Sequence, residues 1–383
     1  MKNLCLAPWN HIQINGDGVI NPCCAFSPTI YNKKYDSLQD AFDGIENDFL
    51  RKRMLKDEKI ASCEKCNMYE NLNKFSYRMH FNKKYDRDTI KNPKIRELEL
   101  SLDNTCNFKC VTCSSRFSSR WFNDDKLMIK HGFSRHSNAL LQDKQVINNS
   151  GDLNDLDLSE LNYLKIIGGE PFINIKYLTI LKNILIENTD LAIITNNSVF
   201  PVKWLDTILR SKSLRIFISI DGVYDTGEFV RYGMNFNKFT KNLLKWKKIE
   251  EECENVSIVF NFVTHSMNVL NLKNTIKYLE ECGFPIEVDE MRNERLEVDF
   301  LKEPSYLNIS YLPDTTKKMI EEKLDFNLNG KRDMIVNFMY SHKFRINECR
   351  NFKKYVLFLS QFRNKEISKD SEDVFNSVCM NLR

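Results

Sequence analysis

The sequence predicts an α/β protein whose central part is a partial, open (β/α)6 barrel of the TIM type. Strand-like and helix-like segments alternate between residues 97 and 288, and this alternation is typical of βαβ units around a parallel sheet. Glycine and polar residues follow several predicted strands, at the edge where barrel enzymes build their active sites. The chain also has twelve cysteines in 383 residues, eight of them before residue 114. We therefore expect the function to involve these cysteines.

The six predicted strands are short runs in which apolar residues alternate with polar ones or stand together. They cover Glu97–Leu102, Tyr163–Ile167, Leu191–Thr195, Leu214–Ile220, Val256–Thr264 and Pro285–Val288. The first strand has a clear period of two and leads directly into a cysteine-rich loop.

The segments between these strands have the apolar spacing of helices. They cover Ser114–Lys130, Asn174–Asn188, Pro201–Ser211, Phe236–Glu252 and Val269–Cys282. Pro201 stands at the start of its helix, where the missing N–H costs nothing. The stretch Gly132–Asp157 is rich in Asn, Asp and Ser and is predicted to be a long loop.

Polar groups follow the first four predicted strands. The first strand leads to a cysteine trio, the second to Gly168-Gly169-Glu170-Pro171, the third to Asn196-Asn197, and the fourth ends at Ser219 and Asp221. Each group alone is an ordinary turn or helix cap. Because the carboxyl ends of parallel strands share one edge, the four groups together predict a single site.

The composition excludes several classes of protein. The 56 basic and 52 acidic residues give a formal charge of +4, which leaves no strong footprint for nucleic acid. The longest apolar runs, such as Val256–Phe260, are strand-sized, so no membrane partner is expected. The first residues lack the apolar core of a signal peptide. We expect a cytoplasmic protein, where reducing conditions favour metal binding or thiol chemistry over disulfides.

The cysteines fall into three groups with different predicted roles: five in the first 70 residues (Cys5, Cys23, Cys24, Cys63 and Cys66), a tight trio, and four isolated ones. Cys106, Cys110 and Cys113 form a C-x3-C-x2-C loop, which provides three soft ligands and leaves a fourth coordination position open. Structural zinc sites close their shell, whereas a [4Fe–4S] cluster with one iron reserved for another ligand needs three cysteines. Cys63 and Cys66 form a C-x2-C pair that alone fits half of a zinc site equally well. The remaining isolated cysteines, Cys253, Cys282, Cys349 and Cys379, are expected to act as small apolar residues.

These motifs resemble those of the radical SAM superfamily. The trio matches its C-x3-C-x2-C signature, and Gly168–Pro171 matches its GGEP motif at the end of the second strand. The resemblance implies that the trio binds three irons of a [4Fe–4S] cluster and that S-adenosylmethionine (SAM) binds the fourth. It implies reductive cleavage of SAM to a 5′-deoxyadenosyl radical, which abstracts a substrate hydrogen.

The same resemblance implies a set of SAM-binding residues. They are Gly168, Gly169, Glu170, Pro171, Asn196, Asn197, Ser219, Asp221 and Arg231. Arg231 corresponds to a family arginine that can reach the SAM carboxylate, for which a guanidinium fork is suited. Thr112 departs from the pattern, because relatives often carry an aromatic residue there, near the adenine.

The N-terminal segment resembles a second known pattern. Cys5, Gly18 and Cys23 fit the C-x(9–15)-G-x4-C opening of SPASM domains and of the shorter twitch domains. Residues 12–20 read as a β-hairpin that returns the chain to Cys5. Because the additional cysteines of a full SPASM domain are missing, the resemblance implies a twitch module with one auxiliary [4Fe–4S] cluster.

The implied ligands of this auxiliary cluster are Cys5, Cys23, Cys63 and Cys66, with Cys24 as an alternative to Cys23. Four protein ligands close the cluster to substrate, which indicates electron transfer. A structural zinc ion on the same four thiolates is the alternative. The expected domains are a twitch/SPASM-like module at 1–85, the radical SAM core at 94–300 and a mostly helical extension at 301–383.

The resemblance implies an oxidoreductase or maturase but does not fix its substrate. A peptide-modifying maturase and a sugar or small-molecule dehydrogenase are equally compatible, with flavodoxin or ferredoxin as the reductant. The catalytic base is unknown, and Glu99, Asp289 and Glu290 are candidates by position only. Two alternatives lie outside radical chemistry. One is a zinc-stabilised binding module, and the other is a thiol–disulfide oxidoreductase, for which the thioredoxin-like βαβ context is missing.

Overall fold

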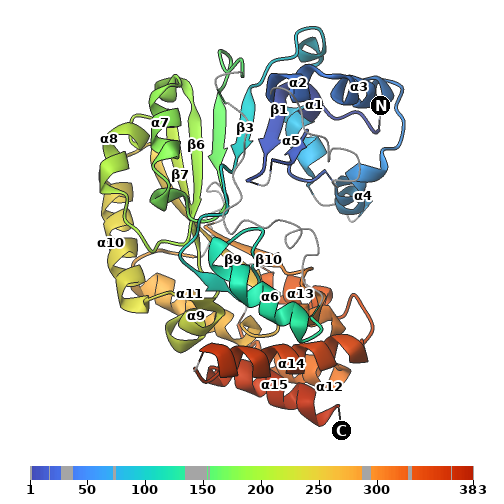
Figure 1. Ribbon diagram of the computed structural model, residues 1–383, viewed down its shortest axis with the longest axis vertical. Helices are drawn as coiled ribbons and strands as arrows, with labels where there is room; N and C mark the ends of the chain where they lie inside the picture. The colour runs from blue at the N-terminus through green and yellow to red at the C-terminus, as the bar shows by residue number, and fades with distance from the viewer. Residues whose placement is uncertain are drawn as a thin grey trace. The chain divides into compact units, whose positions relative to one another are not determined.

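The computed structural model describes residues 2–16, 18–26, 38–71, 75–133, 153, 156–286, 295–326, 330–363 and 365–382. The chain forms two compact units (Figure 1). Unit 1 comprises Met1–Thr105, Val146–Ile194 and Val202–Arg215, and unit 2 comprises Cys106–Gln145, Thr195–Pro201 and Ile216–Arg383.

Unit 1 is built on a mostly parallel sheet. Its strands are β1 (His11–Ile14), β2 (Ile20–Asn21), β3 (Glu97–Leu100), β5 (Tyr163–Ile166), β6 (Asp190–Thr195) and the first residues of β7 (Ser213–Ser219), in the order β7-β6-β5-β3-β1-β2. The predicted N-terminal hairpin is confirmed, because β1 pairs antiparallel with β2. The structure adds that β1 also pairs parallel with β3, so the hairpin extends the sheet (Figure 1).

The two faces of this sheet differ in character because successive side chains point to opposite sides. One face is apolar and fully buried, with Ile14, Leu100 and Ile166 in register across β1, β3 and β5. The other face carries polar side chains, such as Gln13, Glu99 and Lys165 in register. This alternation makes the apolar face the core of the unit.

Short helices accompany the sheet of unit 1. They are α1 (Ala7–Asn10), α2 (Leu38–Asp43), α3 (Ile45–Leu55), α4 (Glu64–Asn71), α5 (Tyr77–Lys84), α7 (Lys176–Lys182) and α8 (Leu205–Ile208). A separate apolar cluster, including Leu6, Trp9, Leu50 and Phe81, packs around Cys5 and Cys23. The N-terminal helices thus form a small core of their own beside β1.

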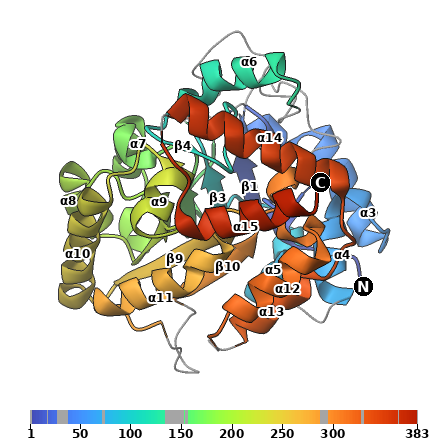
Figure 2. The same cartoon turned by 90° about the horizontal axis from the view of Figure 1, so that it is seen from below.

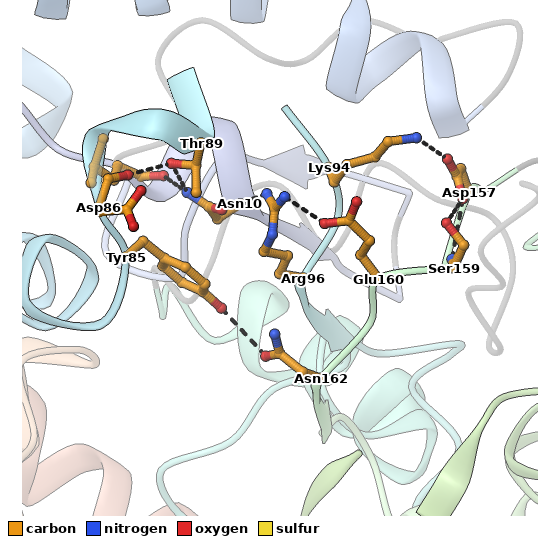
Figure 3. A network of polar contacts seen from close by, with 11 residues as sticks. Asn10, Tyr85, Asp86, Thr89, Lys94, Arg96, Asp157, Ser159, Glu160 and Asn162 are labelled. Atoms are coloured by element: carbon orange, nitrogen blue, oxygen red, sulfur yellow. Dashed lines mark hydrogen bonds and ion pairs between the residues drawn. The ribbon is translucent and has the colours of Figure 1, made fainter. Parts of the chain in front are cut away.

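A polar network holds this N-terminal part to the sheet (Figure 3). Arg96, just before β3, donates from Nη1 to Oδ1 of Asn10 at 2.9 Å and forms an ion pair with Glu160 at 2.5 Å. The Asn10 amide in turn donates to Oγ1 of Thr89 at 3.1 Å. Arg96 therefore connects α1 to the segments that lead into β3 and β5.

Unit 2 contains the remaining strands and the longest helices. The end of β7 lies next to β9 (Val256–Thr264), which pairs parallel with β10 (Leu296–Phe300), and β4 (Lys109–Cys110) pairs antiparallel with β8 (Arg231–Tyr232). The helices are α6 (Phe122–Lys130), α9 (Tyr224–Val230), α10 (Phe236–Glu252), α11 (Leu272–Glu281), α12 (Asp314–Lys323), α13 (Lys331–Met339), α14 (Ile346–Arg363) and α15 (Lys369–Met380). Helices α14 and α15 pack together (Figure 2).

Most predicted elements are confirmed, and the differences have local causes. The sixth strand is β10, at Leu296–Phe300, not at 285–288; Pro285 and Ile286 are in no strand, and residues 287–294 lie outside the described part. The helix predicted from Ser114 begins at Phe122, after a 3-10 turn, because serines such as Ser118 bond to the preceding loop. Most of the predicted loop at 132–157 lies outside the described residues.

The helix predicted over 174–188 is shorter than expected, since α7 ends at Lys182 and a 3-10 turn follows at Ile186–Asn188. The helix predicted over 201–211 consists of a 3-10 turn at Val202–Trp204 and α8. Among the described helices, none is long and apolar enough to cross a membrane.

Candidate functional site

The cysteine trio lies in a loop of unit 2 that is anchored by backbone pairing. Cys110 belongs to β4 and stands directly opposite Arg231 of β8. The pairing continues as Val111 N donates to the Val230 carbonyl at 2.8 Å. Cys113 N donates to the carbonyl of Cys110 at 3.0 Å, which curls the end of the loop. All three cysteines are partly exposed.

Helix α14 supports this loop, a role that the sequence analysis did not predict. Arg363 donates to the Lys109 carbonyl and to the Phe229 carbonyl, both at 2.7 Å. The Tyr355 hydroxyl donates to the Val111 carbonyl at 2.8 Å. Both side chains are buried, and they fix the two strands that carry Cys110 and Arg231.

Hydrogen-bond donors and guanidinium groups lie near two sulfurs of the trio. Asn196 Nδ2 and Phe108 N donate toward the Sγ atom of Cys106, at 3.8 and 3.5 Å. Burial raises the pKa of the Cys110 thiol, and the guanidinium groups of Arg231 and Arg363 act against that rise. Donors and positive charge near a sulfur stabilise its anionic form, which is the form that binds iron.

Arg231 and Asp221 form a buried ion pair beside the trio. The Nη1 atom of Arg231 lies 2.5 Å from Oδ2 of Asp221, and the two residues are 7% and 4% exposed. Asp221 also accepts from Val263 N at 3.1 Å. Among the described residues, no hydrogen-bond partner is found for the Nε atom of Arg231. A buried guanidinium edge is therefore available to an acceptor on a ligand.

The other predicted SAM-binding residues of unit 2 have different contacts, and only one of them bonds to the trio loop. Asn196, after β6, donates to Oδ1 of Asn107 at 2.9 Å as well as toward Cys106, so it belongs to the trio loop. Asn197 has a left-handed backbone, and its amide donates to the Phe239 carbonyl at 3.0 Å. Asn197 thus holds α10. Ser219 is partly exposed at the end of β7.

In unit 1, Gly168–Pro171 follows β5 and packs on the chain just before Cys106. Gly168 and Gly169 have φ angles of 86° and 48°. A Cβ atom on Gly169 would lie 2.0 Å from the Thr105 carbonyl oxygen, which excludes any side chain. Glu170 N donates to that same oxygen at 2.8 Å. The Glu170 carboxylate is buried and accepts from Phe172 N at 3.3 Å.

The four other predicted ligands come together in unit 1. Cys5, Cys23, Cys63 and Cys66 line one small, partly open cavity. Cys5 precedes α1, Cys23 follows the hairpin, and Cys63 and Cys66 lie at the junction of a 3-10 turn and α4. Burial raises the pKa of Cys5 to about 12 and that of Cys63 to about 11. The thiols of Cys5 and Cys63 therefore keep their protons unless a metal ion displaces them.

Cys24 does not line this cavity, although it neighbours Cys23 in sequence. Burial raises the pKa of Cys24 to about 11, and the next largest influences are Glu99 and Lys165 on the polar face of the sheet. The two adjacent cysteines thus have different surroundings. This difference favours Cys23 over Cys24 as the fourth ligand.

Sequence reasoning also missed a buried histidine at the end of β9. His265 Nδ1 accepts from Met267 N at 3.2 Å, so the ring proton is on Nε2, which has no hydrogen-bond partner among the described residues. Burial lowers the pKa of His265 to about 4, against the influence of Asp221. Asn268 Nδ2 donates to the Asp221 carbonyl at 3.0 Å. The sequence could have indicated this residue, because His265 directly follows the predicted strand Val256–Thr264.

Of the three candidates for a catalytic base, the structure describes only Glu99. Glu99 accepts from Gln13 Nε2 at 2.7 Å and lies 3.7 Å from Lys165 Nζ, so its carboxylate is already engaged. Asp289 and Glu290 lie outside the described residues.

Within the described ranges, no three His, Cys, Asp or Glu side chains are grouped so as to hold a single metal ion.

The sequence matches no protein-family model and no curated protein. Several solved structures are similar to the chain. Native anSMEcpe with bound AdoMet is 14% identical, with a TM-score of 0.37, over 71% of this chain and 62% of that one. SuiB of Streptococcus suis bound to precursor peptide SuiA is 12% identical, with a TM-score of 0.35, over 84% and 60%. TYW1 with a lysine-pyruvate adduct is 15% identical, with a TM-score of 0.32, over 64% and 75%.

The chain spans about three fifths of the length of the first two of these proteins.

Proposed function

We propose that the chain is a radical SAM enzyme. The observation that carries this proposal is the anchored C-x3-C-x2-C loop, in which Cys110 stands opposite Arg231 and Asn196 donates toward the sulfur of Cys106. Three cysteines in one loop leave one iron of a [4Fe–4S] cluster free for another ligand. When bound, the cluster and SAM together supply an electron and a 5′-deoxyadenosyl radical that abstracts a substrate hydrogen.

The chain's residues have distinct roles in this proposal. Cys106, Cys110 and Cys113 hold the irons, and the donors around Cys106 stabilise the thiolate charge. The free Nε edge of Arg231 is suited to the SAM carboxylate, with Asp221 fixing the guanidinium. The backbone of Gly168–Pro171 and the buried Glu170 are suited to the methionyl amino group. Ser219 and Asn197 complete the predicted set of SAM-binding residues. Asn197 acts indirectly, because its hydrogen bond to the Phe239 carbonyl fixes the loop after β6.

Four cysteines around one cavity support an auxiliary [4Fe–4S] cluster held by Cys5, Cys23, Cys63 and Cys66. A closed set of four thiolates fits electron transfer, which would convert hydrogen abstraction into a net two-electron oxidation of the substrate. The substrate is a peptide or a small molecule such as a sugar, and flavodoxin or ferredoxin is the proposed reductant. A zinc-stabilised binding module is the alternative, and it uses the same cysteines.

The deciding experiment is anaerobic purification with iron, sulfide and zinc analysis, followed by incubation with SAM and dithionite. We expect a brown protein with about eight irons per chain that forms 5′-deoxyadenosine. Cys106→Ala, Cys110→Ala and Cys113→Ala should each abolish this product, whereas Cys253→Ala, outside both groups, should not. A colourless protein with one or two zinc ions and no iron would overturn the proposal in favour of the zinc-binding module.

A further inference from the structure

An open groove lies on unit 1 beside the four-cysteine cavity. It is wide open to solvent and is lined by Lys2, Glu70, Phe75, Arg78, Met79, Asn82 and Lys83. Phe75 and Met79 are 59% and 44% exposed. Met79 and Lys83 are four residues apart in α5 and share one face of the helix, and Phe75 lies just before the N-cap Ser76. The groove is therefore lined by both apolar and basic side chains.

Arg78 lines both the groove and the four-cysteine cavity. Its guanidinium donates to the Lys2 carbonyl at 2.9 Å and to Asn67 Oδ1 at 2.6 Å, and it lies 3.4 Å from Glu70. A single side chain therefore forms a wall shared by the groove and the cavity.

Helix α5 also holds the segment that carries Cys5. Asn82 Nδ2 donates to the Leu4 carbonyl at 2.8 Å, and Leu6 N donates to Asn82 Oδ1 at 2.9 Å. These two bonds fix the residues on either side of Cys5. Arg78 and Asn82 thus line the groove and at the same time contact the cavity or the segment around Cys5. A protein in the groove would lie one helix away from the four thiolates.

The charged residues that line the groove indicate the charge of the protein that would bind there. Lys2 and Lys83 are basic and exposed, whereas Arg78 is buried and its charge is offset by the ion pair with Glu70. The Glu70 carboxylate also accepts from Ser76 Oγ at 2.5 Å. The net positive charge of the lining, beside exposed apolar side chains, attracts an acidic protein and steers its approach. Transient electron-transfer complexes need only a small interface, below about 1,200 Å².

We infer that this groove docks a small acidic one-electron carrier protein that exchanges electrons with the four-cysteine site. The inference rests on the proposed function, because it requires a cluster in the cavity. In each encounter one electron passes between the carrier and the cluster, one being oxidised as the other is reduced, and no bond forms or breaks. The partner is thus defined by its negative surface and its redox group.

The test measures binding of a purified acidic flavodoxin to the anaerobically purified full chain. We expect Lys83→Glu and Met79→Glu each to raise the flavodoxin Kd about tenfold and to lower the ratio of flavodoxin-driven to dithionite-driven SAM cleavage. Affinity in the wild type should fall as salt is raised. Lys248→Glu, a lysine of α10 with a side chain 74% exposed, is the matched control and should leave both quantities unchanged.

The outcomes separate the two proposals. A Kd that is unchanged in both groove variants overturns the docking inference, whatever the iron content. A chain without iron overturns the proposed function, and with it the electron exchange, even if flavodoxin still binds through Lys83. Binding of an acidic oligopeptide that depends on Lys83 and is tighter than flavodoxin binding would overturn the inference in favour of a peptide site. Iron content and melting temperature of each variant establish that it has folded.

Discussion

Arg231 stands directly opposite Cys110 in a two-stranded antiparallel ladder, and its guanidinium pairs with the buried carboxylate of Asp221. Burial acts to lower the pKa of Arg231, but the neighbouring Cys110 and Asp221 outweigh it and raise the pKa. The arginine is thus charged, buried and attached to the cysteine loop by backbone pairing. Loss of Arg231 should therefore affect both the folding stability of unit 2 and the position of the cysteine loop.

Replacing Arg231 should destabilise the chain strongly, because Asp221 would be left as a buried charge without its partner. We expect Arg231→Ala to lower the free energy of unfolding by about 3–5 kcal/mol. Arg210→Ala is the matched control, since Arg210 pairs with Glu187 on the surface, where both side chains are about 60% exposed. It should cost less than about 1 kcal/mol. Urea denaturation measures both, and equal costs would contradict a buried pair.

Gly169 should tolerate no side chain, because a Cβ atom there would overlap the Thr105 carbonyl. We expect Gly169→Ala to displace the chain before Cys106 and to abolish SAM cleavage. Gly132→Ala is the control, since Gly132 also has a left-handed backbone, with φ of +77°, but no atom lies within 4 Å of the added Cβ. It should cost about 1–2 kcal/mol and retain activity. Equal activities of the two variants would show that the close approach is unimportant.

The sequence predicted elements whose signal is local. Helix α10 and strand β9 have the predicted bounds, because their apolar periodicity and end residues lie within the segments themselves. Strand β10 was missed even though Leu296 and Val298 alternate with Glu297 and Asp299. Because β10 is an edge strand with charged residues on its exposed face, its apolar pattern consists of only a few residues and is weak in the sequence.

Contacts between distant segments were not predictable from local patterns. Gln13 bonds to Glu99 across 86 residues, so the addition of the hairpin to β3 had no local signal. Tyr355 and Arg363 reach the trio loop from 244 and 254 residues away. For the site, spacing singled out the four N-terminal cysteines, and the structure gathers them around one cavity. Their role as cluster ligands remains a prediction.

Cys23 and Cys24 provide a direct test of that role, because only Cys23 lines the cavity. We expect Cys23→Ala to reduce the iron content from about eight to about four per chain, and Cys24→Ala to leave it unchanged. Iron and sulfide analysis after anaerobic reconstitution measures the difference. Loss of iron in Cys24→Ala alone would reverse the assignment. Loss of zinc, with no iron in the wild type, would instead favour the structural zinc site.

His265 should make the stability of the chain depend on pH. Its pKa is about 4 in the folded chain and about 6.5 when exposed. The unfolded chain therefore binds a proton between these values while the folded chain does not. The stability that neutral His265 contributes is fully present above pH 6.5 and is lost as pH falls toward 4. The loss amounts to about 3 kcal/mol at about 1.4 kcal/mol per pKa unit.

His265→Gln removes the titrating group and keeps a polar side chain, so it should flatten this part of the profile. The measurement is the free energy of unfolding of both proteins between pH 7.5 and about 4.5, the range in which the histidine titrates ahead of most carboxylates. We expect the difference between the wild type and the variant to shrink steadily as pH falls, because only the wild type is losing the contribution of a neutral buried imidazole. A difference that stays constant across this range would show that His265 titrates alike in the folded and the unfolded chain, and would overturn the lowered pKa that its burial predicts.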